Sequence, residues 1–146
     1  MKLLFASDHA GFALKRTLMD DQAAKGAEVV DLGPETAERV DYPDFGAKLA
    51  EALRSDPNAR GVLVCGSGIG ISIAANRFAH VRAANCSDVT MARLCRQHND
   101  ANVIAFGERL VGEEVALEAL RVFLTTDFEG GRHAARVEKL ASLSSR

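Results

Sequence analysis

Tryptophan is absent from the sequence, and aromatic residues together make up only 5% of its 146 positions. A surface that stacks nucleic-acid bases is therefore not expected. Cysteine is also scarce: the three cysteines are an odd number, and no two of them form a C-x-x-C pair. This pattern argues against a disulfide framework or a structural zinc site and predicts a reducing, cytoplasmic setting.

A large charge of one sign and a long apolar run are missing as well. The formal net charge is −2, so neither nucleic acid nor an anionic membrane is an expected partner. No apolar run is long enough to span a bilayer. The apolar start at 1–6 is briefly like a signal peptide, but Asp8 and His9 interrupt it, and we interpret it as a first strand.

What remains is an ordinary globular composition in a regular alternation. Apolar residues make up 47% and charged residues 26%, and the length suits one domain over residues 1–146. Short apolar runs predict five strands, at 2–6, 27–32, 61–64, 81–85 and 103–106. Helical spacing predicts helices at 11–25, at 44–54, from the loop after 65 to about 78, from a cap at 87–88 to about 98, at 112–124 and at 132–143.

This alternation predicts an α/β protein, a single three-layer α/β/α sandwich of Rossmann-like type with five parallel strands. Loops at the carboxyl ends of such strands hold the ligand site. The polar residues expected there are 7–9, 65–67, 85–88 and 107–109. The last helix is appended without a partner strand, so we expect it to pack on another subunit of a homo-oligomer.

The segment 62–72, VLVCGSGIGIS, is the most informative stretch of the chain. A strand runs into Cys65, and glycines follow at alternate positions 66, 68 and 70. A glycine loop that opens a helix presents bare backbone amides to an anion, and the same field favours the ionised form of a thiol. The alternative is a buried core cysteine, which position alone leaves about equally favoured. Cys86 and Cys95 lack this setting and are expected to fill the core.

The glycine run also has a second interpretation, as a dinucleotide-binding loop. That motif requires G-x-G-x-x-G after the first strand and an acidic residue after the second. Here the spacing is G-x-G-x-G after the third strand, with Asp88 about one strand further on, so the pattern fits poorly without being excluded. A tight turn without a ligand is the remaining alternative, and an anion cradle is favoured over it.

Two histidine-containing segments could exchange protons or bind substrate. Asp8 and His9 follow the first strand directly, where they could form either a helix cap with a surface histidine or part of a site. His98 ends the fourth predicted helix, where it could satisfy the helix dipole or act as a general acid or base. No spacing such as H-x-H or H-E-x-x-H supports a metal site.

Two arginines of the last predicted helix could bind a phosphate. Arg132 and Arg136 are four residues apart and are expected on one helical face, which suits an anion. Judged alone, a solvated basic face paired with Glu129 or Glu138 is the better interpretation. His133, between the two arginines, is expected to be incidental.

Taken together, these motifs resemble those of the RpiB/LacAB family of sugar-phosphate isomerases, and in particular its type B ribose-5-phosphate isomerases. The resemblance covers essentially the whole chain and rests on five motifs in the same order, at 7–12 (SDHAGF), 41–43 (DYP), 65–76 (CGSGIGISIAAN), 96–103 (RQHNDANV) and 129–133 (EGGRH). It implies interconversion of ribose 5-phosphate and ribulose 5-phosphate without a metal or an organic cofactor. It also implies a dimer or tetramer whose site lies between subunits.

The resemblance also implies roles for individual residues. Cys65 looks like the base that moves a proton between C2 and C1, and His98 looks like the acid/base group that opens the sugar ring, with Asp8 nearby. Ser67 and the backbone amides of the loop look like the cradle for the enediolate. Asn99 looks like a ligand of a sugar hydroxyl, and Tyr42 lines the pocket. The remaining substrate-binding positions are Gly66, Gly68, Ile69, Gly70, His9, Arg109, Arg132 and Arg136, some of them from the neighbouring subunit.

One branch of the family has glycine in place of Cys65 and uses a glutamate at the position of Ile71. The cysteine and the apolar Ile71 of this chain indicate the cysteine branch. Ser67 stands where many members have threonine, which keeps the hydroxyl. Alternatives are an isomerase of galactose 6-phosphate, allose 6-phosphate or a tetrose phosphate, or a sugar-phosphate or nucleotide-binding module without turnover. The presence of both Cys65 and His98 argues against a pure binder.

Overall fold

The computed structural model describes residues 1–143 and contains the five-stranded parallel sheet that the sequence predicts. The strands are β1 (Lys2–Ser7), β2 (Glu28–Asp31), β3 (Arg60–Cys65), β4 (Ala83–Asn85) and β5 (Val103–Gly107). Their order across the sheet is β2-β1-β3-β5-β4. The order reverses between β1 and β3, whose carboxyl ends pair at Ser7 and Val64, and in open parallel sheets a ligand site forms at such a point.

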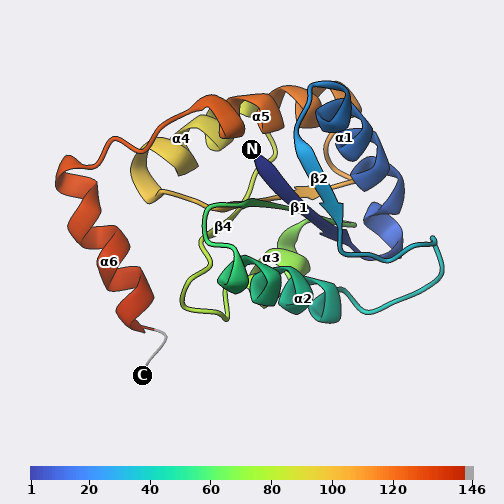
Figure 1. Ribbon diagram of the computed structural model, residues 1–146, viewed down its shortest axis with the longest axis horizontal. Coiled ribbons are helices and arrows are strands. Elements are labelled where there is room, and N and C mark those ends of the chain that lie inside the picture. Colours follow the sequence, from blue (N-terminus) through green and yellow to red (C-terminus); the bar gives the residue numbers. More distant parts are fainter. Residues whose placement is uncertain (144–146) are drawn as a thin grey trace.

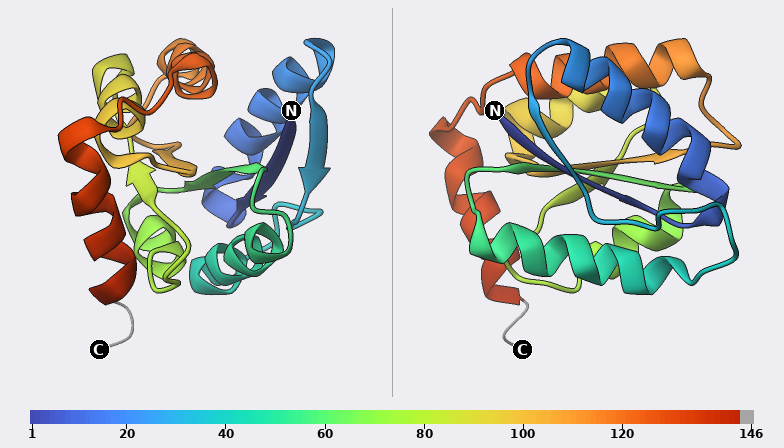
Figure 2. Two further views of the ribbon diagram at one scale, coloured as in Figure 1. Left: turned by 60° about the vertical axis from the view of Figure 1, so that its left-hand side comes forward. Right: turned by 45° about the vertical axis from the view of Figure 1, so that its right-hand side comes forward.

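Helices cover both faces of the sheet, so the predicted three-layer sandwich is confirmed (Figures 1 and 2). They are η1 (His9–Gly11), α1 (Phe12–Ala24), α2 (Tyr42–Ser55), α3 (Ile69–Ala75), α4 (Val89–Asn99), α5 (Glu113–Thr125), η2 (Gly131–His133) and α6 (Ala134–Leu143). One face carries α1, α4 and α5, and the other carries α2 and α3. None of the helices within residues 1–143 is both long and apolar enough to cross a membrane.

The three central strands, β1, β3 and β5, are almost continuously apolar because they are buried on both faces, whereas the edge strand β2 has exposed Glu28 and Asp31 at its ends. Phe5 and Val64 pack toward α1, α4 and α5, whereas Ala6 and Leu63 pack toward α2 and α3. Successive side chains of a strand point to opposite faces, so each of the two cores receives every second residue. This packing fixes where each strand ends, and thereby where the residues that follow it lie.

Predicted boundaries were wrong by a few residues at four places, three of them within the sandwich and one at the start of the last helix. The second helix begins at Tyr42 instead of 44, because Pro43 in its first turn has a backbone already suited to a helix. The helix after the glycine loop ends at Ala75 instead of 78, and the fourth strand begins at Ala83 instead of 81. Asn76 explains both differences, since its side-chain amide bonds the backbone N–H and C=O of Ala83 at 2.8 and 2.9 Å.

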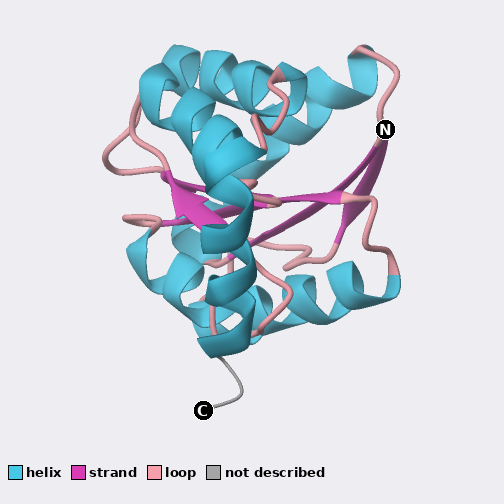
Figure 3. Cartoon of the chain, turned by 90° about the vertical axis from the view of Figure 1, so that its left-hand side faces the viewer, coloured by secondary structure: helices cyan, strands magenta, loops and turns pink. Residues whose placement is uncertain are grey.

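The final helix lies at one side of the sandwich, as Figure 1 shows, and Figure 3 views the molecule from that side, with the helix in front. Gly130 and Gly131 have positive φ angles of 65° and 55° and turn the chain away from the body. A three-residue 3-10 turn, η2, follows, and α6 begins only at Ala134. None of the ten residues of α6 is buried.

Candidate active site

Cys65 ends β3, and its thiol lies beneath the glycine loop. The residue is only 4% exposed, and its sulfur accepts a hydrogen bond from the backbone N–H of Gly68 at 3.1 Å. In the sheet Cys65 pairs with Gly107 of β5, whose backbone lies so close to Ser67 that a side chain at 107 would overlap it. The loop is therefore held from two sides, and the sulfur is held at a defined place.

The alternate glycines let neighbouring groups lie directly against the loop. Gly68 has φ +77°, and a Cβ atom there would overlap the side chain of Asn85. A Cβ on Gly70 would lie 2.5 Å from the ring of Tyr42, and one on Gly66 would lie 3.2 Å from Nη1 of Arg109. Tyr42 and Arg109 thus form walls on either side of the loop.

A pocket of about 560 Å³ opens over the thiol. Nine of the residues predicted for the site line it: Asp8, His9, Tyr42, Cys65, Gly66, Ser67, Ile69, Gly70 and Arg109. A tenth, Gly68, contacts the thiol as described above. Ten of the predicted positions therefore lie together around the Cys65 thiol.

Asp8 and His9 both have structural partners and both line the pocket. The Asp8 carboxylate accepts from the N–H of Gly11 at 3.0 Å, so Asp8 caps η1 and belongs to the pocket at once. Nδ1 of His9 lies 3.2 Å from both the carbonyl oxygen and the amide nitrogen of Val40. The loop before α2 therefore fixes the orientation of this imidazole.

The other four predicted residues, His98, Asn99, Arg132 and Arg136, do not line this pocket. His98 lies in the last turn of α4, the helix that leads from the carboxyl end of β4 back to the start of β5. Cys65 pairs with the last residue of β5, Gly107. The thiol and the imidazole therefore lie at opposite edges of the sheet, separated by the length of a five-residue strand, about 15 Å.

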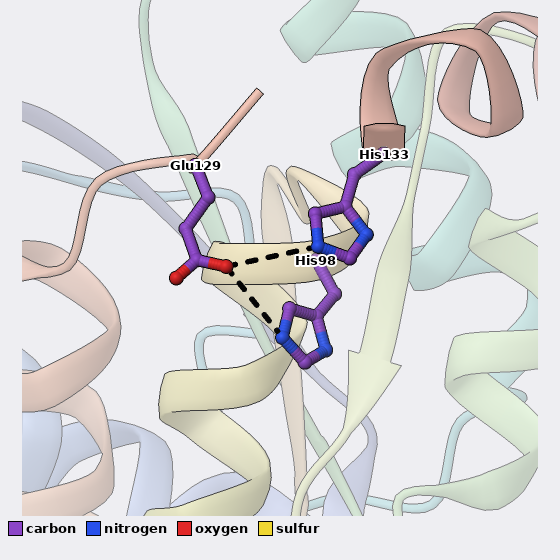
Figure 4. A group of neighbouring side chains, drawn as sticks. All are labelled: His98, Glu129 and His133. Carbon is purple, nitrogen blue, oxygen red and sulfur yellow. Dashed lines mark ion pairs between the residues drawn. The ribbon is translucent and has the colours of Figure 1, made fainter. Parts of the chain in front are cut away.

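His98 belongs to a second cluster, which also contains Glu129 and His133 (Figure 4). Oε1 of Glu129 lies 3.7 Å from Nε2 of each histidine. The two imidazole rings are stacked, with centroids 4.5 Å apart and planes inclined by 18°. The interpretation of His133 as incidental was wrong, because the turn of η2 brings its ring onto that of His98.

Partial burial and charge act together on His133. Desolvation lowers its pKa most, and the nearby positive charges of His98 and Arg132 lower it further, while Glu129 acts in the opposite direction. The neutral form of this imidazole is therefore favoured at neutral pH. A neutral imidazole offers a lone pair to a proton or a metal ion.

The two arginines that the sequence assigns to one helical face lie on two different elements. Arg132 is part of η2 and Arg136 is part of α6, because the 3-10 turn interrupts the helix. Both side chains are exposed. Neither forms the ion pair with Glu129 or Glu138 that the sequence left open, among the described residues.

Asn99, next to His98, lines a separate groove of about 340 Å³, which Leu140 of α6 also lines.

Sequence reasoning missed the residues that hold the end of α4 in place. Arg96 is buried and donates to the Asp100 carboxylate at 2.9 Å, to the carbonyl of Ala101 at 2.6 Å and to that of Thr126 at 3.1 Å. Asp100 has φ 47°, the one positive value at a non-glycine among residues 1–143. An arginine one turn before the end of a helix is usually exposed, so the sequence offers only a weak indication that Arg96 is buried. Its burial depends on how α4 packs against its neighbours.

Lys15 was also missed, and it supports the loop before α2. Its side chain is fully buried, and its ammonium group donates to Asp31 at 2.8 Å and to the carbonyl of Pro34 at 2.9 Å. The same loop reaches Val40, the partner of His9.

Cys86 and Cys95 are buried in the core, as expected. The hydrogen bond between the two thiols is the main cause that raises the pKa of Cys86, and burial is the second.

Comparison with known proteins shows which family this chain resembles. The family described as ribose/galactose isomerase matches residues 3–140 of the chain. The chain belongs to this family. A curated relative, ribose-5-phosphate isomerase B of Escherichia coli, is 45% identical over 145 residues, which cover 99% of this chain and 97% of that protein. The resemblance drawn from the five motifs is thereby confirmed at the level of the family.

Solved structures of ribose/galactose isomerases agree in fold. Ribose-5-phosphate isomerase B of Clostridium thermocellum is similar with a TM-score of 0.97 at 49% identity, covering 99% of this chain and 98% of that one. The isomerase B of Mycoplasma genitalium, solved with bound ribulose-5-phosphate, has a TM-score of 0.94 at 35% identity and covers 99% of this chain and 97% of its own. The fold and the family are therefore those that the motifs predicted.

Proposed function

We propose that this protein interconverts ribose 5-phosphate and ribulose 5-phosphate. The observation that carries the proposal is the Cys65 thiol, which lies beneath a loop of backbone amides in a pocket that Arg109 also lines. Membership of the ribose/galactose isomerase family and the names of its relatives support the same substrate.

The reaction transfers a proton from C2 of the aldose to C1, while the carbonyl group moves from C1 to C2. The Cys65 thiolate removes the C2 proton, and the electrons of that bond form an enediolate whose negative charge lies on O1. Ser67 and the amides of residues 66–70 donate to this oxygen. The O2 proton then passes to O1, Cys65 returns its proton to C1, and the C2 carbonyl group of the ketose forms.

A second copy of the chain completes the site. His98 lies about 15 Å from Cys65 along the sheet, too far to share one sugar within a chain. In the proposed homo-oligomer, a dimer or tetramer, the edge that carries His98 faces the thiol pocket of another copy. His98 of that copy opens the sugar ring by proton transfer, with Asp8 nearby.

The phosphate is held by arginine and histidine side chains contributed by both copies. Arg109 and His9 belong to the thiol pocket, and Arg132 and Arg136 belong to the edge that carries His98 and are exposed. Guanidinium groups bind phosphate through paired hydrogen bonds. Binding energy from this remote group keeps the reacting carbons in position, while Asn99 and Tyr42 contact the sugar.

The test is an assay of ribose 5-phosphate conversion with a chelator present and no added cofactor, comparing the parent with Cys65→Ala. We expect turnover by the parent and a loss of at least about a hundredfold in the variant, because the variant has no base. Loss of activity in the chelator would contradict a cofactor-free reaction. Turnover that survives in Cys65→Ala would move the base to another residue.

The same assay separates the alternatives. Turnover only of galactose 6-phosphate, allose 6-phosphate or a tetrose phosphate would keep the mechanism and change the substrate. Binding of these sugar phosphates without turnover of any of them would favour the non-catalytic module.

A further inference from the structure

The cluster of His98, Glu129 and His133 contains the donor atoms of a metal site. One nitrogen of each imidazole and one carboxylate oxygen all lie within 4.8 Å of one another. In Figure 4 both imidazole nitrogens are turned toward the same oxygen of Glu129, which lies 3.7 Å from each. Two imidazoles and one carboxylate are a common set of protein ligands for zinc.

The spacing fits such an ion closely. Zinc bonds to imidazole nitrogen and carboxylate oxygen are about 2.0–2.2 Å long. Each Nε2 lies 3.7 Å from Oε1 of Glu129, which is less than twice this bond length, so one ion can contact the carboxylate and either imidazole. Contact with all three residues at once requires a change in the orientation of one ring.

One ring has to turn for the ion to bind. A metal ion lies in the plane of an imidazole that binds it, and the two rings here are stacked almost parallel, inclined by 18°. The side chain of His98 is 40% exposed, whereas that of His133 is 12% exposed. His98 is therefore the ring that rotates about its Cβ–Cγ bond.

Backbone contacts hold the three residues in place. The N–H of Glu129 donates to the carbonyl of Gln97, next to His98, at 3.0 Å, and the N–H of His133 donates to Gly130 at 3.0 Å. Arg96 joins the same helix to Thr126 at 3.1 Å. The ligands are thus brought together before any ion arrives, which reduces the entropy cost of binding.

We propose that His98, Glu129 and His133 form a zinc-binding site, and that bound zinc inhibits the protein by occupying Nε2 of His98. The second half of this inference rests on the proposed function, in which that nitrogen transfers the proton that opens the sugar ring. The ion is therefore an inhibitor and not a cofactor. Because Arg132 lies nearby, we expect weaker binding than in closed structural zinc sites.

The binding test needs no activity. Zinc is titrated against a chromophoric zinc indicator, with Cys65→Ser in every variant so that the pocket thiol does not compete. We expect one zinc per chain, with affinity at least about tenfold lower in Glu129→Gln and in His133→Gln. His80→Gln and Glu138→Gln are matched controls outside the cluster and should bind like the parent. Equal affinity in Glu129→Gln, with its circular dichroism unchanged, would overturn the site.

The inhibition test uses the chain with Cys65 intact. We expect zinc to stop ribose 5-phosphate turnover, a chelator to restore it, and Glu129→Gln to require at least about tenfold more zinc for the same fractional loss of its own rate. Equal sensitivity in Glu129→Gln would assign inhibition to the Cys65 thiol instead. A parent that binds zinc but shows no turnover in chelator would contradict the proposed function and leave the zinc site standing.

Discussion

At the scale of single residues, Gly68 is the position where the loop tolerates change least. Its φ of +77° is unfavourable for other residues, and an added Cβ would overlap Asn85. We predict that Gly68→Ala lowers the free energy of unfolding by about 1–3 kcal/mol and also reduces turnover, since its N–H no longer reaches the Cys65 sulfur. Denaturant titration measures the first effect and the isomerase assay the second.

Gly112 provides the control for this change. It precedes α5 with a φ of −66°, and an added Cβ meets nothing within 4 Å among the described residues. Gly112→Ala should alter the free energy of unfolding by no more than about 1 kcal/mol. If both alanine variants unfold at the same denaturant concentration, the conformation of Gly68 is not what restricts the loop.

Lys15 presents a second residue-scale prediction. Lys15→Met removes the buried partner of Asp31 and of the Pro34 carbonyl, and we expect it to lower the free energy of unfolding by about 2 kcal/mol. The surface pair of Lys25 with Asp21 is the comparison, since Lys25→Met should cost less than about 0.5 kcal/mol. Thermal unfolding of the two variants, run side by side, measures the difference. Equal losses would mean that burial of Lys15 adds nothing.

At the scale of elements, the sequence was sufficient to predict the five strands of the sheet but not where every helix and strand begins or ends. The three central strands were predictable because burial on both faces makes them almost continuously apolar, as at 61–64 and 103–106. The edge strands β2 and β4 are partly exposed, and short apolar runs between helical segments indicated them. The end of α3 was not predictable, because the amide of Asn76 bonds Ala83, a contact between elements that periodicity does not record.

The same distinction applies to the site. Positions next to a strand end, such as Asp8 and Cys65, could be grouped from the sequence because parallel strands bring their carboxyl ends together. The contact of His133 with His98 could not, since it depends on how the glycines at 130 and 131 turn the chain. Motif resemblance placed His98 in the site without showing that it lies at the opposite edge of the sheet.

A prediction about α6 belongs to this scale. None of its ten residues is buried within the chain, so a chain that ends at residue 133 should keep the two cores and unfold at nearly the same denaturant concentration. If α6 packs on a second copy, the same truncation should yield monomers with little turnover. Sedimentation velocity measures the size of the oligomer, and circular dichroism shows whether the truncated chain stays folded. An oligomer of unchanged size would mean that another surface makes the contact between copies.

At the scale of the whole molecule, the placement of Cys65 and His98 predicts complementation between two inactive variants. When Cys65→Ala and His98→Gln chains are unfolded, mixed in equal amounts and refolded, half of the dimers contain one chain of each kind. One site in each mixed dimer then has both native residues, so we expect about a quarter of the parent activity. Each variant refolded alone serves as the control, and a mixture no more active than either would mean that the two residues act within one chain.

The opposite-edge arrangement also links catalysis to protein concentration. A chain on its own carries a thiol pocket at one edge of the sheet and a histidine cluster at the other, so under the proposed mechanism we expect no turnover by a single chain. Because association obeys mass action, the rate per chain should fall on dilution below the dissociation constant of the oligomer. Substrate that spans two copies should shift this midpoint to lower protein concentration, so that the sugar phosphate holds together the assembly that consumes it.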